Sequence, residues 1–200
     1  MIFSFIDQKL KYSFRDLRNE KIIYLCYMRK HNGMRPQDIA ILLKIIAIGE
    51  SDWRLQSLSD SMSISLSEIS ESLNRSRIAG LIDYRKEQIN RQNLFEFLIH
   101  GIKYVFPAEL GSLVKGIPTA HSHEYMKQFF KSEMNYVWSE PSGNILGIVV
   151  EPFYKRQVEA VKKDDLFYKI MALSDVIRVG RVREQKVAID ELKRMILNEL

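Results

Sequence analysis

Residues 55–82 read LQSLSDSMSISLSEISESLNRSRIAGLI, and this stretch decides the fold. Its apolar residues recur at spacings of two to four, which favours helices with one buried face. They predict a short helix over about 55–61 and, after a turn at 62–64, a second helix over about 65–79. Ala79 and Gly80 end the second helix, since glycine suits the backbone that follows a helix. The stretch therefore predicts two helices joined by a tight turn.

The start of the second helix has the spacing of a capping box. In that motif the hydroxyl of Ser65 accepts a backbone N–H, and the carboxylate of Glu68 reaches back to the first residue. With the apolar residues directed inward, several polar residues are expected on the outer side. They are Ser67, Glu68, Glu71, Ser72, Arg75 and Ser76.

A further helix is predicted directly before this pair. Pro36 and Asp38 are typical of a helix start, and the apolar residues of 39–46 predict a broad buried face. Gly49 ends this helix, and Ser51–Asp52 have the residue types that cap the next one.

The segment after Gly80 predicts a short strand over 81–84 and a charged loop over 85–92. Helical spacing resumes at Asn93 and continues to Pro107, and Asn90 and Arg91 are expected to cap and tether the start of this helix. Residues 89–108 also resemble stretches of bacterial proteins described as probable transcriptional regulators.

The remainder of the chain differs in pattern. Glycine and proline punctuate residues 107–118, which predicts a domain boundary there. Two strands, 134–138 and 145–150, are expected to form a β-hairpin, and helical spacing follows over 155–178 and after Gly180.

The predicted organisation has three parts. Residues 1–34 are expected to form an N-terminal extension, 35–108 a helix-turn-helix domain, and 109–200 a small α+β domain with a β-hairpin and two or three helices. The expected fold class is therefore α+β and mainly helical.

Charge is unevenly distributed along the chain. The net charge is +5. Residues 1–34 hold seven Lys or Arg against three Asp or Glu, whereas 35–108 hold nine of each and 109–200 fourteen against thirteen. Because the excess lies outside the helix-turn-helix segment, bulk charge does not establish nucleic-acid binding, and the positions of individual charges must decide.

Several functional classes lack their sequence signatures. The one cysteine, Cys26, excludes an intramolecular disulfide and a cysteine-rich zinc site, and it fits a reducing cytoplasm. The longest apolar runs fall well short of the roughly 20 residues of a membrane span. No phosphate-binding loop, dinucleotide fingerprint or hydrolase motif occurs, so we expect no enzymatic activity and no cofactor.

Two groups of polar residues have alternative interpretations. His121, His123 and Glu124 have metal-ligand chemistry, but a polar loop is the simpler interpretation, and we expect no metal. Asp164–Asp165 are interpreted as a helix cap rather than as a general acid and base. The C-terminal aromatic residues are interpreted as a core, with a ligand pocket as the alternative. They are Tyr125, Phe129, Phe130, Tyr136, Trp138, Phe153 and Tyr154.

The helix pair resembles the winged helix-turn-helix modules of MarR-like bacterial transcriptional regulators, in which the second helix enters the major groove. The resemblance covers about 50 residues. The matching positions are Leu55, Leu58, Met62, Glu68–Ser70, Leu73 and Ala79–Leu81.

This resemblance implies a cytoplasmic, sequence-specific regulator that binds double-stranded DNA as a homodimer, with the C-terminal part serving dimerisation or effector sensing. It directs one group of residues toward base edges or phosphates and a second group toward flanking phosphates. The first group is Ser65, Ser67, Glu68, Ser70, Ser72 and Arg75; the second is Arg77, Arg85, Lys86 and Arg91.

An alternative function is a module that binds a protein partner, such as an antitoxin-like subunit. Glu68 and Glu71 repel phosphate unless one accepts a hydrogen bond from a cytosine amino group, and the segment between Tyr84 and Gln92 is short for a two-stranded wing. Under this alternative, Arg75→Ala and Arg77→Ala are silent, whereas under the DNA-binding hypothesis each weakens binding.

Overall fold

The computed structural model describes residues 33–50 and 53–198. Nearly all of the predicted N-terminal extension, and the caps predicted at Ser51–Asp52, lie outside the described residues. Met34–Leu200 form one compact unit. Its elements are mainly helices with one small sheet, so the predicted α+β, mainly helical class is confirmed.

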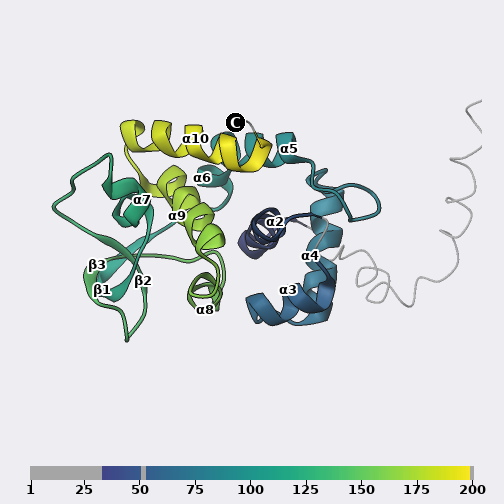
Figure 1. Cartoon of the computed structure of the whole chain (residues 1–200), viewed down its shortest axis with the longest axis horizontal. Helices are drawn as coiled ribbons and strands as arrows, with labels where there is room; N and C mark the ends of the chain where they lie inside the picture. Colours follow the sequence, from purple (N-terminus) through teal and green to yellow (C-terminus); the bar gives the residue numbers. More distant parts are fainter. Residues whose placement is uncertain (1–32, 51–52, 199–200) are drawn as a thin grey trace, which may run out of the picture. The chain divides into compact units, whose positions relative to one another are not determined.

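The helix pair predicted from the sequence is present. Helix α3 (Leu55–Met62) and helix α4 (Leu66–Ile78) are joined by a three-residue turn that begins at Ser63 in the left-handed region. Both helices pack against α2 (Pro36–Ile48), as Figure 1 shows. Because α2 is buried over 38–46, it forms the centre of this three-helix group.

Backbone hydrogen bonds at the helix ends match the expected capping chemistry in part. The Asp38 carboxylate accepts from the backbone N–H of Arg35 at 2.8 Å, which closes the first turn of α2. The Ser65 hydroxyl accepts from the N–H of Glu68 at 3.3 Å. The predicted return bond from the Glu68 side chain is absent among the described contacts, because that carboxylate binds other side chains. Gly80 follows α4 with a φ of 73°.

The segment after α4 is less regular than predicted. The strand expected over 81–84 is reduced to a single antiparallel bridge between Ile82 and Ile89. The helix expected from Asn93 is divided into α5 (Arg91–Glu96), a π-helical turn η1 (Phe97–Gly101) and α6 (Ile102–Val105). As predicted, Asn90 caps it, accepting from the N–H of Asn93.

The sheet corrects two predictions. Strand β1 (Leu110–Pro118) occupies the stretch interpreted as a connection, and it pairs antiparallel with both β2 (Tyr136–Ser139) and β3 (Ile145–Val150). Strands β2 and β3 pair parallel, so they do not form the predicted hairpin. Two apolar runs separated by turn residues identified β2 and β3 as strands, but such runs carry no information about the partners or direction of a strand.

A close backbone crossing makes this sheet possible. The connection between β2 and β3 passes over β1, where a Cβ at Gly143 would lie 2.4 Å from the backbone of Gly116. Only glycine allows two backbones to approach so closely. Gly143 therefore lets this connection lie directly against β1, while Gly116 leaves room for the carbonyl oxygen of Trp138 on β2, which a Cβ at Gly116 would approach to 2.1 Å.

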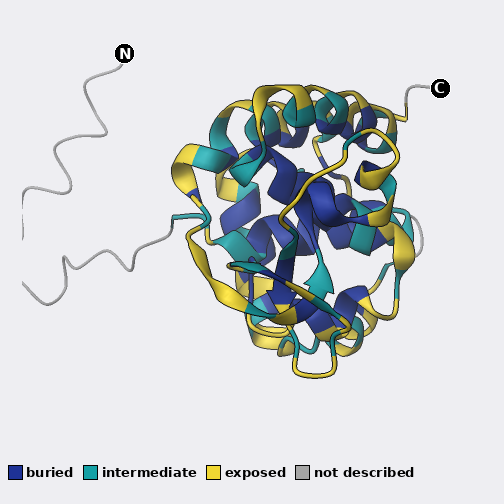
Figure 2. Cartoon of the chain, turned by 90° about the vertical axis from the view of Figure 1, so that its left-hand side faces the viewer, coloured by how far each residue is buried: buried dark blue, intermediate teal, exposed yellow. Residues whose placement is uncertain are grey.

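Helix α9 (Asp165–Val179) lies at the centre of the second half of the unit. All residues over 170–177 are buried, and α9 packs against α2 on one side and α10 (Val182–Leu197) on another. Buried segments gather in the interior in Figure 2. The remaining short elements are η2 (Ala120–Ser122), α7 (Glu124–Lys127) and α8 (Gln157–Val161).

A buried ion pair connects the two halves of the unit. Lys44 of α2 is almost fully buried, and its Nζ donates to the Asp164 carboxylate at 2.7 Å. Asp164 also accepts from the N–H of Phe167, which confirms its predicted capping role. The segments 35–108 and 109–200 thus share one core, while the domain boundary drawn between them stays a prediction.

No helix in the described part of the chain is long and apolar enough to cross a membrane.

Candidate nucleic-acid interface

One side of helix α4 carries a stripe of polar residues, which we call the outer face of α4. It consists of Ser67, Ser70, Glu71, Asn74 and Arg77, spaced by three and four residues along one side. Ser67, Ser70 and Glu71 are exposed, and the Arg77 guanidinium donates to Asn74 Oδ1 at 3.2 Å. Asn74 was not among the predicted contacts, although its position seven residues after Ser67 and four after Ser70 was the available signal.

The inner face of α4 corrects two predicted contacts. Ser72 and Arg75 are buried, so neither side chain is available to DNA. Arg75 Nε and Nη2 donate to the two carboxylate oxygens of Asp38 at 2.8 and 2.7 Å. These bonds raise the pKa of the Arg75 guanidinium above its usual range. Arg75 therefore ties α4 to the start of α2.

The Glu68 carboxylate is shared among three donors rather than left free. Gln37 and Arg75 donate to its Oε1, each at 2.7 Å, and Arg35 lies 3.2 Å from the same oxygen. Because two cations neutralise Glu68, its repulsion of a phosphate is weaker than its sequence position suggests. Arg35, which the sequence analysis did not select, belongs to this cluster.

Ser65 lies at the same end of α4. Its hydroxyl caps the helix and lies 3.1 Å from the Ser67 hydroxyl, with both side chains exposed. This end of α4 therefore carries two hydroxyls directly beside the Glu68 cluster.

The turn over residues 83–88 is organised by one carboxylate. Asp83 accepts from the backbone N–H groups of Glu87 at 2.6 Å and Gln88 at 3.0 Å, and from that of Arg85 at 3.3 Å. These backbone bonds, led by that of Gln88, hold the pKa of Asp83 below its ordinary value. Lys86 has a φ of 61° at the tip. These hydrogen bonds therefore fix the backbone conformation of the turn on which Arg85 and Lys86 lie.

The turn and the outer face of α4 are adjacent. The Arg77 guanidinium lies 5.5 Å from the centre of the Tyr84 ring, within the range of a cation–π contact. A hollow of about 400 Å³ separates the turn from α3 and α4. Its walls are Glu50, Trp53, Leu55, Ser70, Leu73, Arg85, Lys86 and Glu87.

Arg91 does not join this surface as a free cation. Its Nε donates to Glu50 at 2.7 Å, and its Nη1 donates to the carbonyl of Ile196 at 2.6 Å. These contacts connect α5 with the end of α2 and the end of α10. The prediction that Arg91 contacts phosphate is therefore corrected to a tethering role.

The arrangement combines groups that suit a nucleic acid. Hydroxyl and amide side chains hydrogen-bond base edges, and cations on a neighbouring turn attract phosphates. Three cations belong to this surface, Arg77 on α4 itself and Arg85 and Lys86 on the turn, and Glu71 and Glu87 accompany them. Among the ten predicted residues, Ser72 and Arg75 are buried, and Glu68 and Arg91 are held in ion pairs with other side chains.

The histidines considered for a metal have a different setting from the predicted polar loop. His121 lies in η2, and both His121 and His123 are buried. Burial, together with the nearby Lys169 and Lys127, lowers the pKa of His123 to about 4. Over the described ranges, no cluster of three or more histidine, cysteine or acidic residues is arranged to hold a metal ion.

Comparison of the chain with known protein families, curated proteins and solved structures gave no match.

Proposed function

We propose that this protein is a sequence-specific DNA-binding regulator of the winged helix-turn-helix type. In this proposal α4 enters the major groove and the 83–88 turn acts as a short wing. The observation that carries the proposal is the outer face of α4, a polar stripe on the second helix of a helix pair, beside a hydrogen-bonded turn that carries Arg85 and Lys86. That combination supports the proposal because such modules place the second helix of the pair in the major groove.

Each side chain has a role that follows from its chemistry. Asn74 and the serines of the outer face hydrogen-bond base edges, and an Asn side chain pairs well with adenine. Arg77, Arg85 and Lys86 contact phosphates and set the position of α4 in the groove. Glu71, which has no partner among the described residues, accepts from a cytosine amino group.

A homodimer in the cytoplasm completes the proposal. One recognition helix reads only a few base pairs, so two copies on a two-fold site raise affinity and specificity together. The C-terminal half then supplies dimer contacts or senses an effector.

The test is fluorescence-anisotropy binding of the full chain to the duplex upstream of its own gene and to a scrambled duplex, at two salt concentrations. We expect a preference for the native duplex that persists at the higher salt. Equal binding that collapses with salt, or no binding, contradicts a sequence-specific regulator, because phosphate contacts alone carry no sequence information.

A protein partner is the second candidate, and a specific observation favours it. Helix α4 carries an exposed apolar residue at each end, Leu66 at 44% and Ile78 at 52% exposure. Exposed apolar residues on a helix that also carries a polar stripe suit a protein interface. Under this candidate, the protein encoded by the neighbouring gene, as for an antitoxin-like subunit, co-elutes with this chain, and a Leu66→Ser/Ile78→Ser variant loses the complex.

A further inference from the structure

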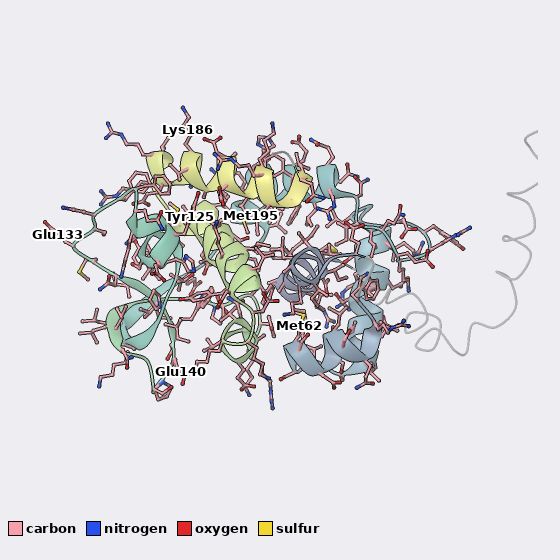
Figure 3. All side chains as sticks on the ribbon, in the orientation of Figure 1. Met62, Tyr125, Glu133, Glu140, Lys186 and Met195 are labelled. Carbon is pink, nitrogen blue, oxygen red and sulfur yellow. The ribbon has the colours of Figure 1, made fainter. Side chains whose placement is uncertain are left out.

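A second cavity lies in the C-terminal half, away from α4. Its volume is about 510 Å³, within the range of small-molecule sites. It is open to solvent and is lined by η2, the loop after α7, strands β2 and β3, the end of α9 and the start of α10; Figure 3 labels Glu133 on that loop. Its walls are His121, Lys131, Ser132, Glu133, Met134, Tyr136, Ile148, Val179, Arg181 and Glu184.

The His121 ring offers this cavity an unused acceptor. The ring is only 7% exposed and lies against Tyr136, with 4.4 Å between ring centres. Its Nε2 lies 2.8 Å from the carbonyl oxygen of Met134, and because a carbonyl only accepts, Nε2 carries the hydrogen. In the neutral ring Nδ1 is then an acceptor.

That acceptor is open to a ligand. Within the described residues Nδ1 has no hydrogen-bond partner, and it is not one of the unpaired side-chain atoms sealed from solvent. An accessible acceptor can bind water or the donor of a ligand, so a ligand that fills this cavity is matched to it when it carries a donor.

The charges around the cavity balance. Lys131 and Arg181 are exposed cations, and Glu133 and Glu184 supply two carboxylates. Glu184 is partly engaged, because it accepts from the backbone N–H of Arg181 at 2.8 Å. A polyphosphate meets repulsion from the carboxylates and a polyamine from the cations, whereas a molecule with one group of each sign meets neither.

The remaining wall is apolar. Met134, Ile148 and Val179 line it, so the ligand has a hydrocarbon part that is removed from water on binding. A donor, a carboxylate and a short hydrocarbon chain are together the features of an aliphatic amino acid.

We infer that this cavity binds a free amino acid with an aliphatic side chain. The ammonium group donates to His121 Nδ1 beside Glu133, the carboxylate lies between Lys131 and Arg181, and the side chain contacts Met134, Ile148 and Val179. This site does not depend on DNA binding, since it is built from different elements and is tested without DNA.

Isothermal titration calorimetry and thermal shift of the full chain against each common amino acid test this inference. Binding of leucine, isoleucine, valine or methionine is expected. Isocaproic acid, which lacks the amine, and isoamylamine, which lacks the carboxylate, are expected to bind at least about tenfold more weakly than leucine. In the complex, the ¹⁵N shift of His121 Nδ1 changes because that nitrogen accepts a hydrogen bond.

Matched variants locate the binding. Lys131→Ala and Arg181→Ala remove exposed side chains, so the fold is retained, and each raises the dissociation constant about tenfold. Lys186→Ala is the control, because Lys186 is an exposed lysine of α10 whose side chain points away from the unit (Figure 3). This substitution is expected to leave binding unchanged. Absence of binding by every amino acid, equal binding of the two analogues, or equal affinity of all three variants overturns the inference.

Discussion

The inner and outer faces of α4 contain the same residue types, serine and arginine, but these residues are buried on the inner face and accessible or half-buried on the outer face. On the inner face Ser72, Ser76 and Arg75 are buried, and Arg75 forms a two-bond ion pair with Asp38. On the outer face Ser67, Ser70 and Arg77 are accessible or half-buried. Arg75 and Arg77 are two residues apart, which turns them about 200° around the helix. The angular position of a polar residue around the helix axis, rather than its type, therefore decides whether its side chain is available to bind a ligand.

The largest expected effect is on the inner face. Arg75→Ala leaves the Asp38 carboxylate buried without its cation, which lowers the free energy of unfolding by about 3–5 kcal/mol. Urea denaturation monitored by circular dichroism measures this loss. Arg77→Ala is the matched control, expected within about 0.5 kcal/mol of wild type because it is a surface change. Equal stability of the two variants would mean that the faces are not distinct.

The next effect is on DNA affinity and belongs to the outer face. Arg77→Ala is expected to weaken binding about tenfold, or about 1.4 kcal/mol, and to lower the salt slope by about 0.9 because one phosphate contact is lost. Anisotropy titrations over a range of salt concentrations give both values. Lys186→Ala, on α10, changes neither; if it weakens binding as strongly as Arg77→Ala, the effect is only one of net charge.

Two serine substitutions in α4 are expected to differ in the same way, with smaller effects on stability than Arg75→Ala. Ser65→Ala removes the cap of α4 and is expected to cost about 1 kcal/mol of stability. Ser72→Ala removes a buried hydroxyl that has no partner among the described residues, so stability stays unchanged or rises by up to about 1 kcal/mol. Thermal denaturation of the two variants compares their stabilities. A large loss of stability in Ser72→Ala is incompatible with an unpaired Ser72 hydroxyl.

The smallest effect concerns the turn beside the outer face. The folded pKa of Asp83 is lowered, so its bonds to the 85, 87 and 88 amides are complete above the ordinary value of 3.8. They are lost only as the pH falls through the lower folded pKa. Amide shifts of Glu87 and Gln88 followed by NMR between neutral pH and pH about 2 report this step. In Asp83→Asn the step disappears; a step at the ordinary value in wild type contradicts the turn geometry.

The sequence predicted helices α2, α3 and α4 well because the information that specifies them is local. Spacing, the Pro36 start, the Ser65 cap and the Gly80 end each act within a few residues. The sheet was predicted poorly because the pairing of β1 with two later strands is set by contacts distant in the chain. Glycines at 116 and 143 marked the crossing, but they also suit ordinary turns.

The candidate site was predicted in part for a related reason. The sequence assigned Arg75 to the outside, since an arginine in the middle of an amphipathic helix is usually exposed. Its burial depends on Asp38, 37 residues earlier, and nothing in the local pattern specifies that partner. The same error in the angular position of residues around α4 left Asn74 out of the prediction, although it shares the outer face with Ser67 and Ser70.

The outer face of α4 is proposed to lie against DNA, and photo-crosslinking is the most direct test of this contact. A photoreactive amino acid replaces Ser70 on the outer face, or Lys186 on α10 as the control, and each protein is irradiated with the duplex upstream of its gene. The account predicts a protein–DNA adduct from position 70 and none from position 186. No adduct from position 70, or equal adducts from both, would contradict it.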